Sequence, residues 1–427
     1  MGCDKNRVDT EKMLSFISER HQLTADMSQA EIIVITTCAF LESARREAIE
    51  EILSAGKLKG TAKLKKLIVT GCLAQKFIND IFGEMPEVDA FLGVSDYRLI
   101  NDVIDRVMAG ERVNAVGTPG KECGEKRVLT TENFAYLKIA DGCSNHCTYC
   151  LIPKIRGKFR SVPVRDLLEE AAGLGEIKEL ILVAQDTAKY GSDLGKDITL
   201  TSLVRQLSRL ENIKKIRLLY CYPENVTDEL IEEIKCNEKV IKYIDMPMQH
   251  ADDTVLKLMN RKGTGKGYLD LIGKLRKEIS GISIRSTFIT GFPGETDERF
   301  NTLVEFVIKA RLDNVGFFAY SREEGTPAYN LDGQLPERIK RARLKKLYSV
   351  QQKVVSDMHR KLVGKNLTVT VDGFSEEYSA YYGRTYQSAP GVDWQVYFFS
   401  QSELSAGDEI QVKINDFKEF DLYGEQI

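Results

Sequence analysis

The sequence lacks a long apolar run, a strong excess of charge of one sign and an apolar leader. No stretch of about 18 apolar residues occurs in its 427 residues, so no transmembrane helix is expected. Residues 1–11 are polar and charged, which argues against a secretory signal. Lys and Arg total 60 and Asp and Glu total 63, so the net charge of −3 gives no argument for nucleic-acid binding. We therefore expect a cytoplasmic protein of two or three domains.

A paired disulfide pattern is also lacking. The nine cysteines are an odd number and several lie in apolar runs, which favours reduced thiols and metal ligands. Six of them form two groups, a tight triad of Cys143, Cys147 and Cys150 and a loose triad of Cys3, Cys38 and Cys72. Three thiolates can hold three irons of a 4Fe–4S cluster and leave the fourth iron open. The two triads therefore predict two iron–sulfur centres and redox chemistry.

Zinc is the alternative for the tight triad, with His146 as a fourth ligand. Structural zinc usually draws its ligands from two separated pairs. Here three thiols lie within eight residues with no second Cys pair nearby, so an iron–sulfur cluster is favoured. The remaining cysteines, Cys123, Cys221 and Cys236, have no partners at metal spacing and are interpreted as ordinary small residues.

Residues 1–125 predict an α/β domain with a parallel sheet. Helices are expected at 9–19 and 39–58, and short β-branched runs predict strands at 31–37 and 66–70. Cys38 and Cys72 directly follow these strands, where open α/β sheets build their sites. Cys3 should lie at a similar position, although no strand sequence precedes it. A Gly-rich, charged segment at 117–131 predicts a linker.

Residues 129–358 predict a partial parallel (βα)6 barrel with helices outside. Strands are expected at 135–140, 180–184, 216–220, 243–246, 283–289 and 315–320, and helices between them, for example at 165–175 and 201–210. Polar or special residues follow each strand, such as Gln185, Gln249 and the run Gly291-Phe-Pro-Gly-Glu295. In a parallel barrel these positions converge on one face, which carries the site.

The last hundred residues change character twice. Residues 334–361 predict one long helix with nine Lys/Arg against two Asp/Glu and an apolar stripe of Ile339, Leu347, Val350, Val354 and Met358. Residues 361–427 alternate short strands and turns, which predicts a small all-β barrel. From residue 362 onward this barrel holds eleven Asp/Glu and four Lys/Arg, a net charge of −7.

The Cys-x-x-x-Cys-x-x-Cys loop after the first barrel strand resembles the radical S-adenosylmethionine superfamily. The resemblance implies that the open iron binds the amino and carboxylate groups of S-adenosylmethionine. It further implies that Tyr149 lies near the adenine, that Gln185 meets the amino group, and that Gln249 or His250 reaches the ribose. The segment Gly291 to Glu295 resembles the cofactor-contacting loop of that family. Taken alone, each of these positions could equally be a plain loop or turn residue.

The three-part plan resembles the methylthiotransferases, whose last module is a TRAM domain. Tyr382-Gly-Arg-Thr-Tyr386 and Phe420-Asp-Leu-Tyr-Gly-Glu425 carry the TRAM resemblance. The segment Gly2-Cys-Asp-Lys-Asn-Arg-Val-Asp-Thr-Glu11 is similar to the branch that modifies an aspartate of the twelfth small-subunit ribosomal protein. The other branch modifies adenosine in transfer RNA and usually has Gln-Met-Asn there. A non-catalytic metal-binding adaptor is the third alternative.

The resemblance also implies a mechanism and partners. The tight-triad cluster would reduce S-adenosylmethionine to a 5′-deoxyadenosyl radical, which takes hydrogen from the aspartate β-carbon. The loose-triad cluster would supply methylated sulfur. The acidic barrel would repel a phosphate backbone and attract a basic ribosomal protein, unless its charges only keep it soluble. The basic helix at 334–361 could instead meet ribosomal RNA, or only pack its apolar stripe on the barrel. We expect a monomer with an electron donor such as flavodoxin or ferredoxin and no catalytic acid or base.

Overall fold

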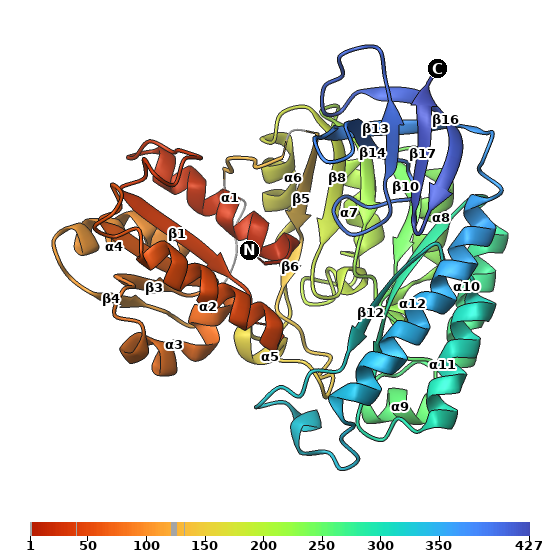
Figure 1. The fold of residues 1–427 in the computed structure, drawn as a ribbon, viewed down its shortest axis with the longest axis horizontal. Helices are drawn as coiled ribbons and strands as arrows, with labels where there is room; N and C mark the ends of the chain where they lie inside the picture. The colour runs from red at the N-terminus through yellow and green to blue at the C-terminus, as the bar shows by residue number, and fades with distance from the viewer. Residues whose placement is uncertain (1, 40, 121–125, 132) are drawn as a thin grey trace.

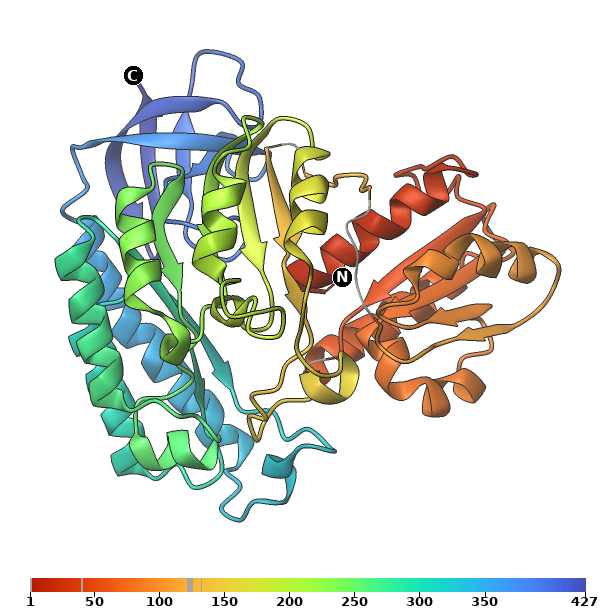
Figure 2. The ribbon, with the colours of Figure 1, turned by 180° about the vertical axis from the view of Figure 1, so that it is seen from behind.

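The computed structural model describes residues 2–39, 41–120, 126–131 and 133–427. Its strands form three large sheets that follow one another along the chain (Figure 1) and are seen from behind in Figure 2. The predicted fold class is confirmed: an α/β unit with a parallel sheet, an open parallel half-barrel and an all-β barrel. Within these described ranges, no helix is both long and apolar enough to span a bilayer. Cys123 lies outside the described residues.

The first unit is a four-stranded parallel sheet in the order β1-β2-β3-β4. Its elements are α1 (Asp4–Ser18), β1 (Ile32–Thr37), α2 (Glu42–Gly56), β2 (Lys66–Gly71), α3 (Cys72–Glu84), β3 (Ala90–Leu92), η1 (Tyr97–Leu99), α4 (Ile100–Met108) and β4 (Val113–Ala115). The predicted strands correspond to β1 and β2, and the helix predicted at 39–58 is α2. Helix α1 begins five residues before its predicted start. Its first turns are stabilised because Lys5, Asn6 and Val8 are buried, and Val8 and Lys5 pack against residues of the second unit.

The second unit is a six-stranded parallel sheet in the order β12-β11-β10-β9-β8-β5. Its elements are β5 (Phe134–Lys138), β6 (Ala140–Asp141), α5 (Ile152–Ile155), β7 (Arg160–Ser161), α6 (Val164–Ala172), β8 (Ile177–Val183), η2 (Thr187–Lys189), α7 (Leu200–Leu207), β9 (Ile213–Leu218), η3 (Pro223–Asn225), α8 (Asp228–Cys236), β10 (Val240–Asp245), α9 (Asp253–Leu258), α10 (Gly265–Glu278), β11 (Ser283–Thr290), α11 (Asp297–Ala310), β12 (Asn314–Ala319), η4 (Pro327–Asn330) and α12 (Glu337–His359). Since β5 and β12 are the two edges of this sheet, the half-barrel is open.

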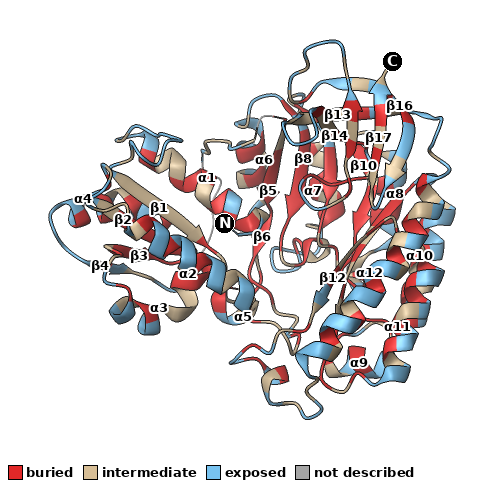
Figure 3. Cartoon of the chain, viewed as in Figure 1, coloured by how far each residue is buried: buried red, intermediate tan, exposed pale blue. Residues whose placement is uncertain are grey.

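Both faces of the half-barrel sheet are buried (Figure 3). In β8, Leu180 and Leu182 join the large apolar core shared with the surrounding helices. The alternate residues Ile181 and Val183 join a separate cluster on the opposite face. A parallel sheet covered on both sides reads as a continuous apolar run, which is why its strands could be located from the sequence.

The long helix α12 forms as predicted, but the prediction of its buried face is only partly right. Leu347 and Val354 are buried, whereas Lys340, Arg343 and Gln351 take buried places that the apolar stripe did not include. These polar side chains are buried because each finds a partner on the half-barrel. Lys340 donates to the Tyr320 carbonyl at 2.9 Å, and Gln351 donates to the Leu312 carbonyl at 2.8 Å. Two of the basic side chains therefore pack inward.

The third unit is a closed barrel in the order β13-β14-β15-β17-β16. Its strands are β13 (Asn366–Ser375), β14 (Ala380–Arg384), β15 (Val396–Phe399), β16 (Glu409–Lys418) and β17 (Asp421–Gln426). Buried ion pairs attach it to the half-barrel: Arg285 bridges Asp393 of the barrel and Asp245 of β10, each at 3.0 Å. The Tyr243 hydroxyl donates to Asp393 at 2.7 Å.

Candidate active site

The tight triad lies on the loop that leaves the first strand of the half-barrel. Because β6 pairs antiparallel with β7, residues 142–159 form a loop whose two ends are held together. Gly142 opens it with φ of 74°, and a Cβ there would lie 2.2 Å from the Lys158 carbonyl oxygen, so only glycine fits. The Cys143 N–H donates to the Gly157 carbonyl at 3.1 Å. The backbone therefore fixes the first thiol of the triad.

The surroundings of the tight triad suit an iron–sulfur cluster. Cys143 and Cys147 are 7% and 5% exposed, and all three thiols are free of disulfides. Backbone N–H groups donate to two of the sulfur atoms, that of Asn145 to Cys143 at 3.5 Å and that of Ile152 to Cys150 at 3.4 Å. Such N–H donors stabilise sulfur that carries negative charge. The donor set therefore fits the cluster.

Burial raises the pKa of the Cys143 thiol to about 11, and the nearby Cys147 adds to this rise. Burial also raises the pKa of Cys150, again helped by Cys147. A bound metal must therefore replace protons on these thiols. In the described part of the chain, no three His, Cys, Asp or Glu side chains converge on a single metal ion. A cubane cluster spreads its thiolates more widely, because each binds a different iron atom.

The loose triad gathers at the carboxyl end of the first sheet. Cys38 directly follows β1 and Cys72 directly follows β2, and the two strands pair with Thr37 opposite Gly71, as predicted. Cys3 is the exposed residue that precedes α1. Burial raises the pKa of Cys72 to about 12, and Cys3 and Cys38 raise it further. The structure therefore brings the three thiols close enough to interact electrostatically.

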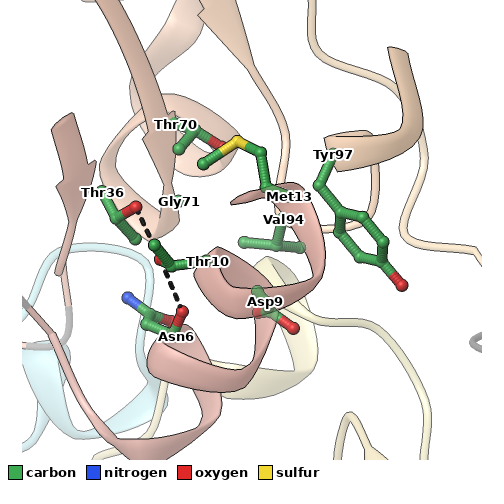
Figure 4. Close-up of a pocket in the computed structure, with 9 residues that line it drawn as sticks. All are labelled: Asn6, Asp9, Thr10, Met13, Thr36, Thr70, Gly71, Val94 and Tyr97. Carbon is green, nitrogen blue, oxygen red and sulfur yellow. Dashed lines mark hydrogen bonds between the residues drawn. The ribbon is translucent and has the colours of Figure 1, made fainter. Parts of the chain in front are cut away.

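Asn6 links two thiols of the loose triad to the first sheet. Its Oδ1 lies 4.0 Å from the Cys3 sulfur and 3.7 Å from the Cys72 sulfur, and its Nδ2 donates to the Thr37 carbonyl at 3.0 Å. Figure 4 shows Asn6 on the rim of a small cavity between α1 and the sheet, beside Thr10, which hydrogen-bonds Thr36 at 2.8 Å. The first turn of α1 is anchored on the half-barrel, because the Tyr220 hydroxyl donates to Asp4 at 2.7 Å.

A buried ionic network joins the surroundings of the two triads. Arg156, 1% exposed, donates to Asn6 at 2.5 Å, to Asp9 at 3.0 Å and to Asp141 at 2.8 Å. Asp141 lies two residues before Cys143, whereas Asn6 and Asp9 belong to α1. Lys138 of β5 also pairs with Asp9 and, at 3.5 Å, with Asp141. One cation therefore contacts residues beside both groups of thiols.

Gln185, the predicted partner of the cofactor's amino group, adjoins this network. Its Nε2 donates to Asp141 at 2.8 Å, while its Oε1 is buried without a hydrogen-bond partner in the described structure. An unpaired buried acceptor is costly, so a donor from a bound molecule would be favourable there. Tyr149 packs edge-to-face on Phe292 with centroids 6.5 Å apart. This contact places the predicted adenine neighbour against the Gly291–Glu295 loop.

Glu295 holds the Gly291–Glu295 loop from within. Its carboxylate accepts from the Gly291 N–H at 2.9 Å, from Thr290 at 3.1 Å and from Arg343 of α12 at 2.6 Å. His250 lies 3.1 Å away; its Nδ1 accepts the Asp252 N–H, so its Nε2 donates to Glu295. Burial alone would raise the pKa of Glu295, but these donors keep it below its usual value. In the described residues, the contacts found for the Glu295 carboxylate hold the loop in place.

Gln249 and Gly291 both have left-handed backbones, with φ of 73° and 77°. Gln249 continues the sheet beyond β10, because its N–H donates to the Thr287 carbonyl at 2.8 Å and its carbonyl accepts from Ile289 at 2.7 Å. A Cβ on Gly291 would lie 2.5 Å from the Lys340 side chain. Backbone strain in a non-glycine residue such as Gln249 is often retained at functional sites.

Sequence reasoning missed Arg156 and Lys138 as parts of the site, whereas Asp141 lies, as predicted, at one of the strand ends that converge on it. Lys138 carried a usable signal, because a lysine inside a buried apolar strand needs a partner. Arg156 carried none, since its partners Asn6 and Asp9 lie 150 and 147 positions away in the chain. Tyr222, which the sequence places after a strand on the same face, has its hydroxyl 3.4 Å from the Cys147 sulfur. His146, the alternative zinc ligand, is exposed, Cys221 is buried, and Cys236 is exposed beside Glu232.

The fold and the cysteine loop define a radical S-adenosylmethionine enzyme. The family model described as "Radical SAM superfamily" matches residues 137–307, and the one described as "TRAM domain" matches residues 363–427. Residues 1–93 match the model described as "Uncharacterized protein family UPF0004". Enzymes of this superfamily use S-adenosylmethionine and 4Fe–4S clusters, and the tight triad supplies thiols that suit such a cluster.

Full-length relatives make the assignment narrower. The chain is 46% identical over 430 residues to a protein of Lachnoclostridium phytofermentans named ribosomal protein uS12 methylthiotransferase RimO, covering 99% of this chain and 98% of that one. A protein of the same name from Clostridium botulinum strain Eklund 17B is also 46% identical, over 99% of this chain and 96% of that one. The chain belongs to the RimO family of radical S-adenosylmethionine methylthiotransferases.

Solved structures agree on the fold. The radical S-adenosylmethionine methyltransferase TsrM from Kitasatospora setae, solved with cobalamin and a [4Fe-4S] cluster, superposes with a TM-score of 0.52. It is 14% identical, and the match covers 75% of this chain and 69% of that one. At this identity the likeness shows the fold alone.

Proposed function

We propose that this chain transfers a methylthio group to the β-carbon of an aspartate in the twelfth small-subunit ribosomal protein, uS12. The observation that carries the proposal is the pair of cysteine triads whose surroundings meet at Arg156, in a chain that matches proteins named for this activity along its whole length. The tight triad accounts for the removal of hydrogen but offers no sulfur to transfer. A second triad nearby gives a place from which sulfur can be delivered.

The tight triad would hold one 4Fe–4S cluster and the loose triad a second. When bound, the reduced cluster and S-adenosylmethionine supply a carbon radical that attacks an unreactive C–H bond. The protein's own part is to position these groups and exclude water. The burial of Cys143 and Cys147 and the backbone donors to sulfur serve this purpose, and no side chain needs to act as an acid or base.

The S-adenosylmethionine side of the site is proposed from five residues: Tyr149, Gln185, Gln249, Gly291 and Glu295. The unpaired Oε1 of Gln185 supports a contact with the cofactor's ammonium group. The packing of Tyr149 on Phe292 supports a flat apolar surface for the adenine. The saturated carboxylate of Glu295 supports a role in shaping the loop at Gly291. Gln249, which has a left-handed backbone, would contact the ribose.

We further propose the organisation in which this site works. The domains run over residues 1–125, 129–358 and 361–427, and the chain acts as a cytoplasmic monomer that takes electrons from a flavodoxin or ferredoxin. The acidic third domain, with a net charge of −7, binds the basic ribosomal protein. The same charge disfavours transfer RNA, because RNA binding depends on cations that neutralise phosphates.

Mass spectrometry of the two candidate substrates tests the proposal. The full chain is reconstituted anaerobically with iron and sulfide, then incubated with S-adenosylmethionine, a reductant and either uS12 or transfer RNA. A methylthio mass increase on one aspartate of uS12 is expected, and Cys143→Ala should abolish it. Modification of transfer RNA in place of the protein would overturn the proposal. Binding of one zinc ion per chain without formation of deoxyadenosine would instead support a non-catalytic metal-binding adaptor.

A further inference from the structure

A row of tyrosines crosses the outer face of the third unit. Tyr382 of β14 lies opposite Tyr397 of β15, which in turn lies opposite Tyr423 of β17. The rings of Tyr397 and Tyr423 stack, with centroids 5.6 Å apart and planes at 20°. The Tyr382 and Tyr397 centroids are 6.3 Å apart. Three neighbouring strands therefore present the same side chain at the same register position.

These tyrosines do not build the core of the barrel. Their strand neighbours Val396, Phe398 and Leu422 are at most 1% exposed and fill the interior. Because side chains alternate along a strand, the tyrosines between them point outward. On β14, Tyr382 lies opposite Gly373 of β13, and its ring lies over that glycine. These three tyrosines therefore lie on the surface of the barrel, outside its core.

Two more aromatic side chains extend the surface. Tyr378, from the turn between β13 and β14, places its ring 4.7 Å from that of Tyr397 and is 48% exposed. Phe399, two residues beyond Tyr397 on β15, is 68% exposed. A group of exposed aromatic side chains on one face usually marks an interaction surface, because aromatic residues are enriched in interfaces. We define the tyrosine row as Tyr378, Tyr382, Tyr397 and Tyr423.

The charges around the row are mainly negative. Burial raises the pKa of Tyr397, and Asp421 and Glu377 raise it further by their charge. The pKa of Tyr423 is raised by burial and then by Asp421 and Glu419. Lys418 lies opposite Asp421 in the β16–β17 ladder, so one of these carboxylates has a cation near it. The unit as a whole carries a net charge of −7.

We propose that the tyrosine row is the docking surface for an arginine-bearing segment of the basic protein substrate. This inference rests on the proposed function, because it names the surface by which that substrate is held. Guanidinium planes stack on tyrosine faces, and the surrounding carboxylates pair with their charge. Stacked aromatics on a small β-barrel could also hold the bases of single-stranded RNA. The carboxylates favour the arginine segment, because they repel phosphates.

Binding to the full chain tests the docking surface. The probes are a short peptide of alternating arginine and glycine, the same peptide with citrulline at each arginine, and oligouridine. Citrulline keeps the shape of arginine and removes its charge. The double variant Tyr397→Leu/Tyr423→Leu removes two rings and keeps apolar bulk, and Tyr397→Phe/Tyr423→Phe keeps the rings. Equal melting temperatures of the two variants show that the barrel still folds.

The Leu variant should bind the arginine peptide and uS12 about fivefold or more weakly than wild type, since each exposed cation–π contact is worth about 0.5–1 kcal/mol. The Phe variant should bind as wild type does, and the citrulline peptide should bind weakly to all forms. Equal affinity of Leu and wild-type chains for the arginine peptide would overturn the proposal, as would a Leu effect confined to oligouridine.

Methylthiolation measured in parallel separates this proposal from the proposed function. If wild type modifies uS12 and the Leu variant keeps its KM and its peptide affinity, only the docking surface is wrong. If wild type does not modify uS12, the proposed function fails, and the peptide binding still decides whether the row binds arginine. The expected result is a raised KM for uS12 in the Leu variant with little change in kcat.

Discussion

Arg156 and Asn6 are 150 positions apart in the sequence and are joined by a hydrogen bond of 2.5 Å between the guanidinium and the side-chain amide oxygen. Asn6 Oδ1 also lies within 4.0 Å of the Cys3 sulfur and 3.7 Å of the Cys72 sulfur. On its other side Arg156 is held by Asp141, at the base of the loop that carries the tight triad. One buried cation therefore joins the surroundings of the two groups of thiols.

Replacing Arg156 by methionine should destabilise the protein by about 3–5 kcal/mol, because Asp9 and Asp141 are left buried with one cation fewer. Calorimetry should show a lowered melting temperature. Arg156→Lys should remain well below wild type, since one ammonium group cannot contact Asn6, Asp9 and Asp141 together. The matched control is Arg46→Met, which removes an exposed arginine whose Glu42 pair is worth about 0–1 kcal/mol. Equal melting temperatures for the Met variants at 46 and 156 would contradict this account.

Iron analysis should separate the two triads. Cys143→Ala and Cys72→Ala should each lower the iron bound after reconstitution by about four atoms per chain, because each removes a ligand of a different cluster. Only Cys143→Ala should abolish deoxyadenosine formation from S-adenosylmethionine. Cys221→Ala, which changes a buried cysteine outside both triads, is the control and should retain full iron content. Loss of deoxyadenosine in Cys72→Ala with full iron would show that the roles are assigned wrongly.

Glu295→Gln should loosen the Gly291–Glu295 loop. The amide cannot accept from Gly291, Thr290, His250 and Arg343 as the carboxylate does, and the Arg343 charge loses its partner. We expect a loss of about 2–4 kcal/mol of stability and weaker binding of S-adenosylmethionine by equilibrium dialysis.

The comparison for Glu295 is Glu337→Gln, because Glu337 contacts the buried Lys340 but is itself exposed. That variant should bind S-adenosylmethionine as wild type does. The account of Glu295 as the residue that shapes the loop fails if Glu295→Gln binds the cofactor with unchanged affinity.

The parts of the site that could be predicted are those fixed by local pattern. Cys38 and Cys72 follow short β-branched runs, and parallel strands must end on the same edge of their sheet, so their proximity was readable. Arg156 was not readable, because its partners come from α1 and β6 and only the tertiary fold brings them together. The same holds for Lys340 and Arg343 on α12, which look like solvated cations until their acceptors on the half-barrel are known.

His359, at the end of α12, should make the stability of the protein depend on pH. Its ring packs on Trp394 of the third unit with centroids 5.0 Å apart, and its buried Nδ1 has no partner in the described structure. Burial lowers the pKa of His359 to about 4 from an ordinary value near 6.5. The unfolded chain therefore binds a proton more readily, and stability present above pH 6.5 is lost as the pH falls towards 4. The full loss is about 3 kcal/mol.

His359→Phe should flatten the pH dependence of the melting temperature between pH 6.5 and 4, since phenylalanine keeps the packing on Trp394 and cannot take up a proton. Asp313 works in the opposite direction, because burial raises its pKa to about 6 and protonation relieves a buried charge. Asp313→Asn should therefore steepen the loss of stability on acidification, and the two variants should move the profile in opposite senses. A His359→Phe profile that falls as steeply as wild type would place the acid-sensitive group elsewhere.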